Sequence, residues 1–199
     1  MTQEEFLQRL NQYRLIASVK EVKYLEKAAS AQLSAAVLSI GNIGVIKGYV
    51  DFFKSAGIPV FLHLERMGGI SHDREGITFL AHYVKPDGIV TTRNTLIKLA
   101  KKQGLLTIQR LFLVDSDSLK SGLQSVSENQ PDAVELMPAL LPEMIEEYRR
   151  VLDTPIIAGG LLRTRDQMHI ALNSGAIAVS VGSPTLWKEN VQHVPSPVV

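Results

Sequence analysis

Two glycine-containing motifs late in the sequence have the composition of an anion-binding site. Gly159-Gly160 end the apolar run "PIIAGG", and Gly182-Ser183 end the run "VSVGS". A phosphate group needs backbone N–H donors at close range, and glycine permits that approach because it has no side chain. Ser183 adds a hydroxyl donor and Arg163 adds a positive charge. We predict that these five residues form a phosphate site, although each glycine motif alone is equally compatible with a tight turn.

Other polar side chains lie where apolar runs end, and they are candidates for contacting the rest of a ligand: Arg93, Arg110, Glu135, His63 and Glu65. Arg110 interrupts an apolar run, and a buried arginine needs an anionic partner. Glu135 is either that partner or a group that holds ligand hydroxyls, and the sequence leaves both roles open. His63 also lies within an apolar run, which favours an interior histidine with satisfied hydrogen bonds.

These residues indicate binding more than catalysis. His63, Glu65 and Glu135 are the candidate acids or bases, but there is no GxSxG nucleophile motif and no compact metal-ligand spacing such as HExxH. We place no lysine at a predicted strand end. The loop "HLERMGGISHDREG" is long, and its paired glycines are typical of a mobile lid or a binding surface. We predict no catalytic residues, no metal and no cofactor, and a polar face that holds a small phosphorylated polyol.

The elements that position these residues alternate along the chain. Eight short apolar runs predict strands, and segments with helical spacing follow them. The strands are expected at 15–19, 36–40, 59–64, 88–92, 106–111, 133–137, 155–158 and 176–181. The helices are expected near 20–31, 43–56, 73–83, 94–103, 117–129, 141–152, 164–174 and 184–190, with an extra N-terminal helix over 4–10. Because the runs are apolar throughout, they are typical of parallel strands buried on both faces.

Eight strand–helix units predict an α/β fold, a (β/α)8 TIM barrel of minimal size, with a doubly wound open sheet as the alternative. In many such barrels the loops after strands seven and eight bind phosphate, and both glycine motifs fall there. A short helix starting near Pro184 would point its positive end at the anion. Asn94, Asp115 and Thr164 are predicted helix caps. We expect one domain over 1–199, with a loose tail over about 191–199.

Composition narrows the classes of partner. The 199 residues include 21 Lys and Arg and 20 Asp and Glu. This near balance argues against strong non-specific binding to polyanions. There is no cysteine, so disulfides and thiolate chemistry are excluded. The start "MTQEEFLQRL" is not a signal peptide, and no stretch is long and apolar enough to cross a bilayer. We therefore expect a cytoplasmic protein with no membrane partner.

Four segments carry a resemblance to a known family: "KPDGIVTTRNTLIKLAKKQGLLTIQRLFLVDSDSL", "PDAVELMPALLPEMI", "PIIAGGLLRTRDQ" and "ALNSGAIAVSVGSPTLW". The order and spacing of "TTRN", "IQRLF" and "AGG-x-x-RT" are specific, whereas the glycines alone match many phosphate-binding barrels. From about residue 15 to Trp187 the sequence resembles the glycerol-3-phosphate-responsive antiterminators, which regulate glycerol uptake operons.

The resemblance implies a (β/α)8 barrel without known catalysis. Such proteins bind glycerol-3-phosphate and then act on the leader of an operon's mRNA, preventing premature termination. Carried over residue by residue, the phosphate lies at Gly159, Gly160, Gly182 and Ser183 with Arg163 nearby, while Arg93, Arg110 and Glu135 line the polar face. Two stretches depart from the family pattern: "HLER" replaces "HVDL", and "SIGNIG" replaces "DIHLG". These two departures bear on which phosphorylated ligand the protein selects.

The resemblance also implies RNA binding, for which the sequence offers local basic clusters. Lys98, Lys101, Lys102 and Arg165 are the candidate RNA contacts, and solvated helix faces are their simpler interpretation. An RNA surface that forms on ligand binding or in a homo-oligomer would suit a sensor. The alternative function is a TIM-barrel enzyme, such as an isomerase, aldolase or phosphodiesterase, acting on a small phosphorylated polyol or sugar.

Overall fold

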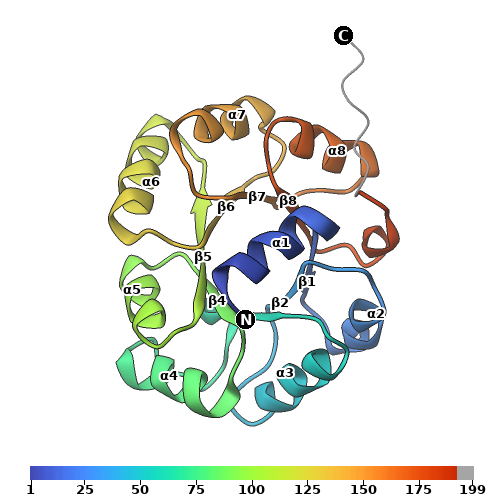
Figure 1. Ribbon diagram of the computed structural model, residues 1–199, viewed down its shortest axis with the longest axis vertical. Helices are drawn as coiled ribbons and strands as arrows, with labels where there is room; N and C mark the ends of the chain where they lie inside the picture. Colours follow the sequence, from blue (N-terminus) through green and yellow to red (C-terminus); the bar gives the residue numbers. More distant parts are fainter. Residues whose placement is uncertain (192–199) are drawn as a thin grey trace.

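The computed structural model describes residues 1–191, and over these residues eight parallel strands close into one barrel (Figure 1). Each strand pairs with its neighbours in chain order, and β1 also pairs with β8. The predicted (β/α)8 barrel is therefore confirmed, and the open sheet is wrong because an open sheet leaves its edge strands unpaired. The strands are β1 Leu15–Val19, β2 Ala35–Leu38, β3 Val60–His63, β4 Gly88–Thr91, β5 Leu106–Phe112, β6 Ala133–Met137, β7 Ile156–Gly159 and β8 Ala178–Val181.

The helices form a ring around the strands, except the N-terminal helix, which lies across one end of the barrel, as Figure 1 shows. They are α1 Gln3–Tyr13, α2 Leu25–Ala29, α3 Ile46–Ser55, α4 Arg74–Phe79, α5 Asn94–Lys102, α6 Ser116–Asn129, α7 Pro142–Val151 and α8 Arg165–Asn173. A π-helical turn, η3 Leu80–Val84, continues α4, and the shorter 3-10 turns are η1 Val22–Tyr24, η2 Leu64–Arg66 and η4 Leu186–Lys188.

The predicted elements differ from the observed ones mainly at the two ends of the barrel sequence. The helix expected near 20–31 is divided into η1 and α2, and the one expected at 184–190 is only the three-residue η4. The predicted loose tail is wrong at its first residue, because Val191 is 1% exposed. Residues 192–199 lie outside the described part of the chain.

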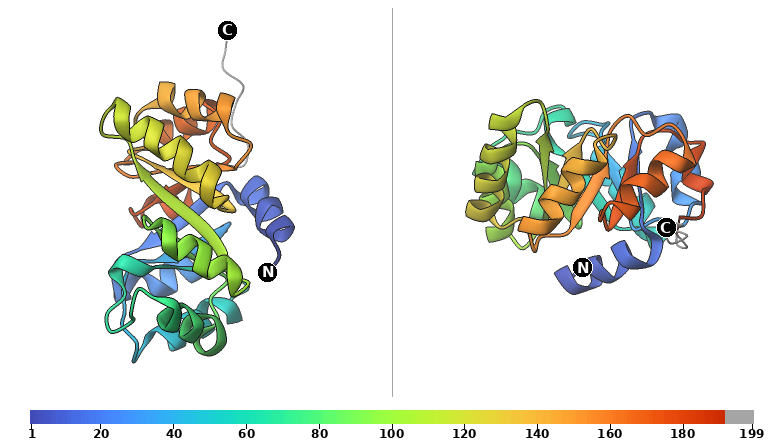
Figure 2. Two further views of the ribbon diagram at one scale, coloured as in Figure 1. Left: turned by 90° about the vertical axis from the view of Figure 1, so that its left-hand side faces the viewer. Right: turned by 90° about the horizontal axis from the view of Figure 1, so that it is seen from above.

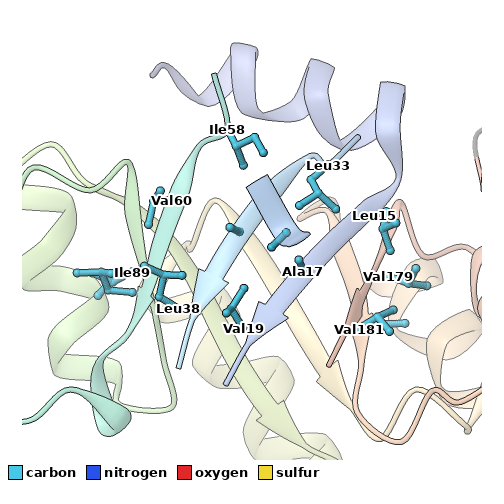
Figure 3. Packing of buried hydrophobic residues seen from close by; sticks show 14 of the residues in the cluster. Leu15, Ala17, Val19, Leu33, Leu38, Ile58, Val60, Ile89, Val179 and Val181 are labelled. Atoms are coloured by element: carbon cyan, nitrogen blue, oxygen red, sulfur yellow. The ribbon is translucent and has the colours of Figure 1, made fainter. Parts of the chain in front are cut away.

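Two apolar layers hold the barrel together. The outward faces of the strands pack beneath the helices, and Figure 3 shows part of this layer, with Val19, Leu38 and Val181 among its residues. A smaller layer fills the barrel interior toward the amino ends of the strands. Strand side chains alternate between the two faces, so continuous apolar runs supply both layers at once.

The extra N-terminal helix α1 closes one end of the barrel. It lies across the amino ends of the strands (Figure 2) and buries Phe6 and Leu10 in the interior layer. Arg9 donates to the carbonyls of Leu33 and Ser34 just before β2. With this end covered, the carboxyl ends of the strands are the open end of the barrel.

Side-chain caps fix two of the helices next to the site. Asp115 accepts from the backbone of Ser118 at the start of α6, and Thr164 accepts from Gln167 at the start of α8, so both predicted caps are confirmed. The predicted Asn94 cap is wrong. Its side-chain oxygen instead accepts from Ser125 Oγ on α6 (2.7 Å) and from the β5 amide of Gln109 (3.1 Å), and so ties α5 to its neighbours.

Candidate functional site

The barrel interior changes from apolar to polar toward the carboxyl ends of the strands. The inward positions near the amino ends carry Ile16, Phe61 and Ile108. The inward positions two residues further along these and other strands are polar and at least nine-tenths buried, namely Ser18, His63, Arg110, Glu135 and Ser180. We call these five residues the polar floor. Buried polar groups are stable only where they have partners, so the partners of the floor define what it can bind.

An ion pair lies at the centre of the polar floor. Arg110 and Glu135 are register partners on β5 and β6, and Arg110 Nε donates to Glu135 Oε2 at 2.8 Å. The structural pairing that the sequence left open is therefore present. It uses only one oxygen, since Glu135 Oε1 is buried and has no hydrogen-bond partner among the described residues. That oxygen is free to accept from a ligand.

His63 continues the network from Arg110. The Arg110 Nη1 lies 3.0 Å from His63 Nε2, and Ser39 Oγ lies 3.1 Å from His63 Nδ1. Burial and then the charge of Arg110 lower the pKa of His63 to about 4. The ring is therefore neutral at neutral pH and able to accept from Arg110. His63 is an interior histidine with hydrogen-bond partners, as its apolar sequence context predicts.

Glu65 links this network to the start of α5. Its Oε1 accepts from Thr91 Oγ1 (2.5 Å) and from the Thr92 backbone N–H (3.0 Å), while its Oε2 lies 3.4 Å from His63 Nε2. Burial raises the pKa of Glu65, but the hydrogen bonds from Thr91 and Thr92 outweigh burial and hold that pKa below its usual value. Glu65 is thus an ionised carboxylate that fixes the segment between β4 and α5.

The two glycine motifs line up on neighbouring strands, yet their glycines serve different purposes. Gly160 has φ +82, a conformation that favours glycine. Gly159 is needed for space, because a Cβ there would lie 2.4 Å from Glu135 Oε1. Gly182 borders Lys20, whose Nζ would lie 3.3 Å from an added Cβ. The sequence allows access for an anion or a tight turn, and the structure adds another reason, the space that Glu135 occupies beside Gly159.

A cleft of about 200 Å³ opens beside these glycines at the carboxyl ends of β7 and β8. It brings together four of the five predicted phosphate residues, and Gly159 lies behind it, next to Glu135. Drug-sized ligands occupy pockets of roughly 300–1,000 Å³, so this cleft suits a smaller molecule. The cleft is lined by Ser18, Lys20, Met137, Gly160, Leu161, Leu162, Arg163, Ser180, Gly182 and Ser183.

Lys20 is the cleft residue that sequence reasoning missed. It directly follows β1, so the prediction that no lysine lies at a strand end is wrong. Its exposed side chain lines the cleft beside Gly182, and Arg163 belongs to the same lining. The strand-end criterion finds Lys20 when it is applied to the run "LIASVK" as strictly as to the later strands. Two cations and the bare backbone of two glycines thus face one cleft.

The predicted helix dipole at Pro184 is not supported. Pro184 lies in a turn, and the following η4 has only three residues, too few for a helix terminus with a useful dipole. Ser183 Oγ is instead 2.9 Å from Thr185 Oγ1. The hydroxyl remains in the cleft lining, so its predicted role as a donor does not depend on the helix.

The long loop after β3 is packed rather than lid-like. Gly68 N–H donates to the Gly41 carbonyl and the Gly68 carbonyl accepts from Ile43 N–H, which joins the loop to the β2–α3 segment. His72 Nε2 contacts the Leu64 carbonyl at 2.9 Å. Within residues 1–191, no group of three or more His, Asp or Glu side chains is placed to hold a metal ion.

The remaining candidates lie away from the cleft. Arg93 is exposed at the start of α5, and Lys98, Lys101 and Lys102 are exposed along that helix. Arg165 lies on α8, in a different part of the ring (Figure 1), where its guanidinium donates to the Asn190 carbonyl at 3.3 Å. The four RNA-contact candidates therefore do not form one surface.

Comparisons with known proteins agree with this geometry. Residues 15–187 match the family described as glycerol-3-phosphate responsive antiterminator. The solved structure of a glycerol uptake operon antiterminator regulatory protein from Listeria monocytogenes is 34% identical, with a TM-score of 0.82 over 87% of this chain and 94% of that one. A glycerol uptake operon antiterminator-related protein from Thermotoga maritima is 25% identical, with a TM-score of 0.78 over 88% and 98%.

A relative from Escherichia coli K12, named uncharacterized protein YgcP, is 32% identical over 178 residues, which is 89% of this chain and 93% of the relative. In the part of the chain that the structure describes, no helix is long and apolar enough to cross a membrane. The family match covers the barrel from β1 to η4, including the cleft, the polar floor and the start of α5. The chain therefore belongs to the glycerol-3-phosphate responsive antiterminator family.

Proposed function

We propose that this protein is a cytoplasmic antiterminator that senses glycerol-3-phosphate and then binds the leader of a glycerol-utilisation mRNA, without turnover and without a cofactor. One observation carries the ligand assignment. The cleft is lined by two cations and by Ser180, whose buried Oγ has no partner among the described residues. Glu135 Oε1, also buried and without a partner among those residues, lies next to Gly159 behind the cleft. A molecule with an anionic end and a hydroxylated end satisfies both groups of atoms.

The phosphate is assigned to the outer part of the cleft. Lys20 and Arg163 supply positive charge, and Ser183 supplies a hydroxyl. Gly160 and Gly182 leave the backbone accessible, as a phosphate site requires. Because both cationic side chains are exposed at the open end of the barrel, they can attract an anionic ligand from solution.

The glycerol hydroxyls are assigned to the polar floor. Ser180 is 4% exposed and Glu135 is 1% exposed, so water is largely kept from their unpaired oxygens. Leaving a buried polar group without a partner costs about 1–3 kcal/mol, which a ligand hydroxyl recovers. Gly159 is the register partner of Ser180 and lies against Glu135 Oε1, so the two oxygens belong to one corner of the floor. This corner distinguishes the glycerol ester from inorganic phosphate.

An enzyme with an amine nucleophile is the second candidate function, and Lys20 is the observation that favours it. A lysine at a strand end beside a phosphate site has the placement that a Schiff base with a phosphorylated ketose requires. Borohydride reduction in the presence of dihydroxyacetone phosphate tests this candidate. A covalent adduct on Lys20, found by mass spectrometry, would support the aldolase class, and an unmodified protein supports the sensor.

Two measurements test the proposed function. Calorimetric titration compares glycerol-3-phosphate with glycerol and inorganic phosphate, and phosphorus NMR follows the ester for turnover. We expect binding of the ester, much weaker binding of either fragment, and no product. A labelled leader transcript of a glycerol uptake operon is then titrated with and without the ester. Conversion of the ester, or absence of RNA binding in both states, would contradict the sensor.

A further inference from the structure

The stretch from Arg74 to Lys102 concentrates positive charge. It contains six Lys and Arg residues and two acidic residues, so it carries +4, whereas the whole chain carries +1 and the remainder therefore carries −3. One of the two acids, Asp87, is engaged near Lys54 and the N-terminal amine, 3.9 Å from each. The near-neutral total charge thus conceals a strongly basic segment, which forms α4, η3, β4 and α5.

Two cations of this segment, Arg74 and Lys102, line a groove between two helices. On α5, Leu96, Ile97 and Ala100 are buried, whereas Lys98, Lys101 and Lys102 are exposed. Lys101 Nζ donates to the Gln130 carbonyl at the end of α6. Lys98 and Lys102 are four residues apart and so lie on one side of the helix. A groove between α4 and α5 is lined by Arg74, Ile77, Leu99, Lys102 and Gln103. Positive groups from both helices therefore border the same groove.

A stacked aromatic pair lies beside the groove. Phe79 and Tyr83 have ring centroids 5.2 Å apart and an interplanar angle of 24°, and Tyr83 is 58% exposed. Phe79 lines a second hollow together with Arg74, Glu75 and His82, and Gln103 lines both hollows. An exposed ring in a stack offers a π-face on which a nucleic-acid base can continue the stack.

Cations along a groove together with an open aromatic stack are the features of a single-strand binding surface. We propose that this surface, the α4–α5 face formed by Arg74, Phe79, His82, Tyr83, Lys98 and Lys102, binds single-stranded RNA. The proposal rests on the proposed function and assigns its RNA partner to one side of the barrel wall. Figure 1 shows the two helices side by side in the ring.

Charge and chemistry favour this occupant over others. A second copy of the chain that docked through the same face would bring one basic face against another, which is unfavourable. An RNA duplex keeps its bases stacked inside, where Tyr83 cannot reach them, whereas a single strand exposes them. On α8, Arg165 already contacts Asn190 and lies 3.8 Å from Glu189, so that helix offers less free positive charge.

The test uses the full-length protein and a labelled leader transcript of a glycerol uptake operon, measured by fluorescence anisotropy across a salt series. We compare Lys98→Gln/Lys102→Gln and Tyr83→Ala with the control Lys120→Gln/Arg150→Gln, which removes two exposed charges on α6 and α7. The Lys98/Lys102 variant should bind about tenfold more weakly, with a salt slope smaller by about 1.4 for two lost phosphate contacts. Tyr83→Ala should weaken binding with the slope unchanged, and the control should bind like the wild type.

Calorimetry with glycerol-3-phosphate on each variant separates this proposal from the proposed function. We expect unchanged ester affinity in all of them, because none of the substituted residues lines the cleft. Equal RNA binding by the wild type and both α4–α5 variants overturns the surface and leaves the sensor intact. Absence of RNA binding by the wild type overturns both. Competition by an RNA duplex or by polyglutamate as effective as that by the unlabelled transcript also overturns the single-strand assignment.

Discussion

At the scale of single residues, Gly159 shows that one glycine can decide the shape of the polar floor. An added Cβ would lie 2.4 Å from Glu135 Oε1, and Glu135 is 1% exposed and held by Arg110, so it has little room to move. Gly159→Ala should lower the free energy of unfolding by about 1–3 kcal/mol and abolish ester binding. Chemical denaturation and calorimetry measure the two effects.

The control for this substitution is Gly48→Ala in α3. An added Cβ there meets nothing within 4 Å, and Gly48 is the third residue of the helix. Alanine should therefore stabilise the protein by up to about 1 kcal/mol. Equal effects of the two substitutions, or full ester binding by Gly159→Ala, would show that the Glu135 contact does not constrain the floor.

Ser180 and Lys20 should separate the two ends of the ligand. Ser180→Ala removes a buried hydroxyl that has no partner in the described chain, so it should weaken glycerol-3-phosphate about five- to tenfold, the value of one hydrogen bond. It should leave inorganic phosphate binding unchanged. Lys20→Gln should weaken both ligands, because the amine faces the phosphate part of the cleft. Competition titrations measure the affinity of each variant for glycerol-3-phosphate and for inorganic phosphate. A loss of phosphate binding in Ser180→Ala would reverse the assignment of the two ends of the ligand.

His63 makes stability depend on pH in a defined direction. Burial and the charge of Arg110 lower its pKa from 6.5 to about 4. Between these values the unfolded chain binds a proton that the folded protein does not, so acidification favours unfolding. The melting temperature of the wild type should fall more steeply from pH 6.5 to pH 4 than that of His63→Gln. Parallel curves over this range would show that His63 is not held neutral by the fold.

At the scale of elements, the strands were predictable and several contacts between elements were not. Each apolar run predicts a strand to within a few residues, because strands buried on both faces admit few polar residues. Asn94 was misassigned for a physical reason. An asparagine before a helical segment has the composition of a cap, whereas its partners Gln109 and Ser125 come from β5 and α6 and are visible only in three dimensions.

The candidate site was likewise predictable in its position and not in its contacts. Its position follows from the sequence, since strand ends and glycines identify the cleft between β7 and β8. Its details do not, because a contact such as that between Gly159 and Glu135 depends on strand register, which a single sequence does not determine. The α4–α5 groove is a further example: the lysines of α5 are evident in the sequence, but Arg74 and Phe79 join them only once the helices pack.

At the scale of the whole molecule, a series of side-chain contacts runs from the polar floor to the start of α5. Glu135 holds Arg110, Arg110 contacts His63, His63 approaches Glu65, and Glu65 accepts from Thr91 at the end of β4. The same Thr91 hydroxyl accepts from the backbone N–H of Arg93, the residue that precedes α5. A ligand that binds Glu135 is therefore connected by direct contacts to the start of the proposed RNA-binding helix.

This series of contacts predicts that the affinity for the ester and the affinity for RNA are coupled through Thr91. If the ester raises RNA affinity by some factor, RNA must raise ester affinity by the same factor. Thr91→Val keeps the shape of a fully buried side chain but removes the hydroxyl between Glu65 and Arg93, so it should reduce that factor toward one. Ester affinity without RNA should stay within about twofold of the wild type, since Thr91 does not line the cleft.

The matched control is Thr107→Val on β5. Thr107 is also fully buried and hydrogen-bonded, but its partner is Asp132 at the amino end of the barrel, away from the chain of contacts. Both substitutions should lower stability, and only Thr91→Val should lower the coupling factor. That factor comes from RNA titrations with and without saturating ester. A wild-type factor in Thr91→Val, or equal losses in the two variants, would show that coupling does not pass through Thr91 and reaches α5 by the packing of the barrel as a whole.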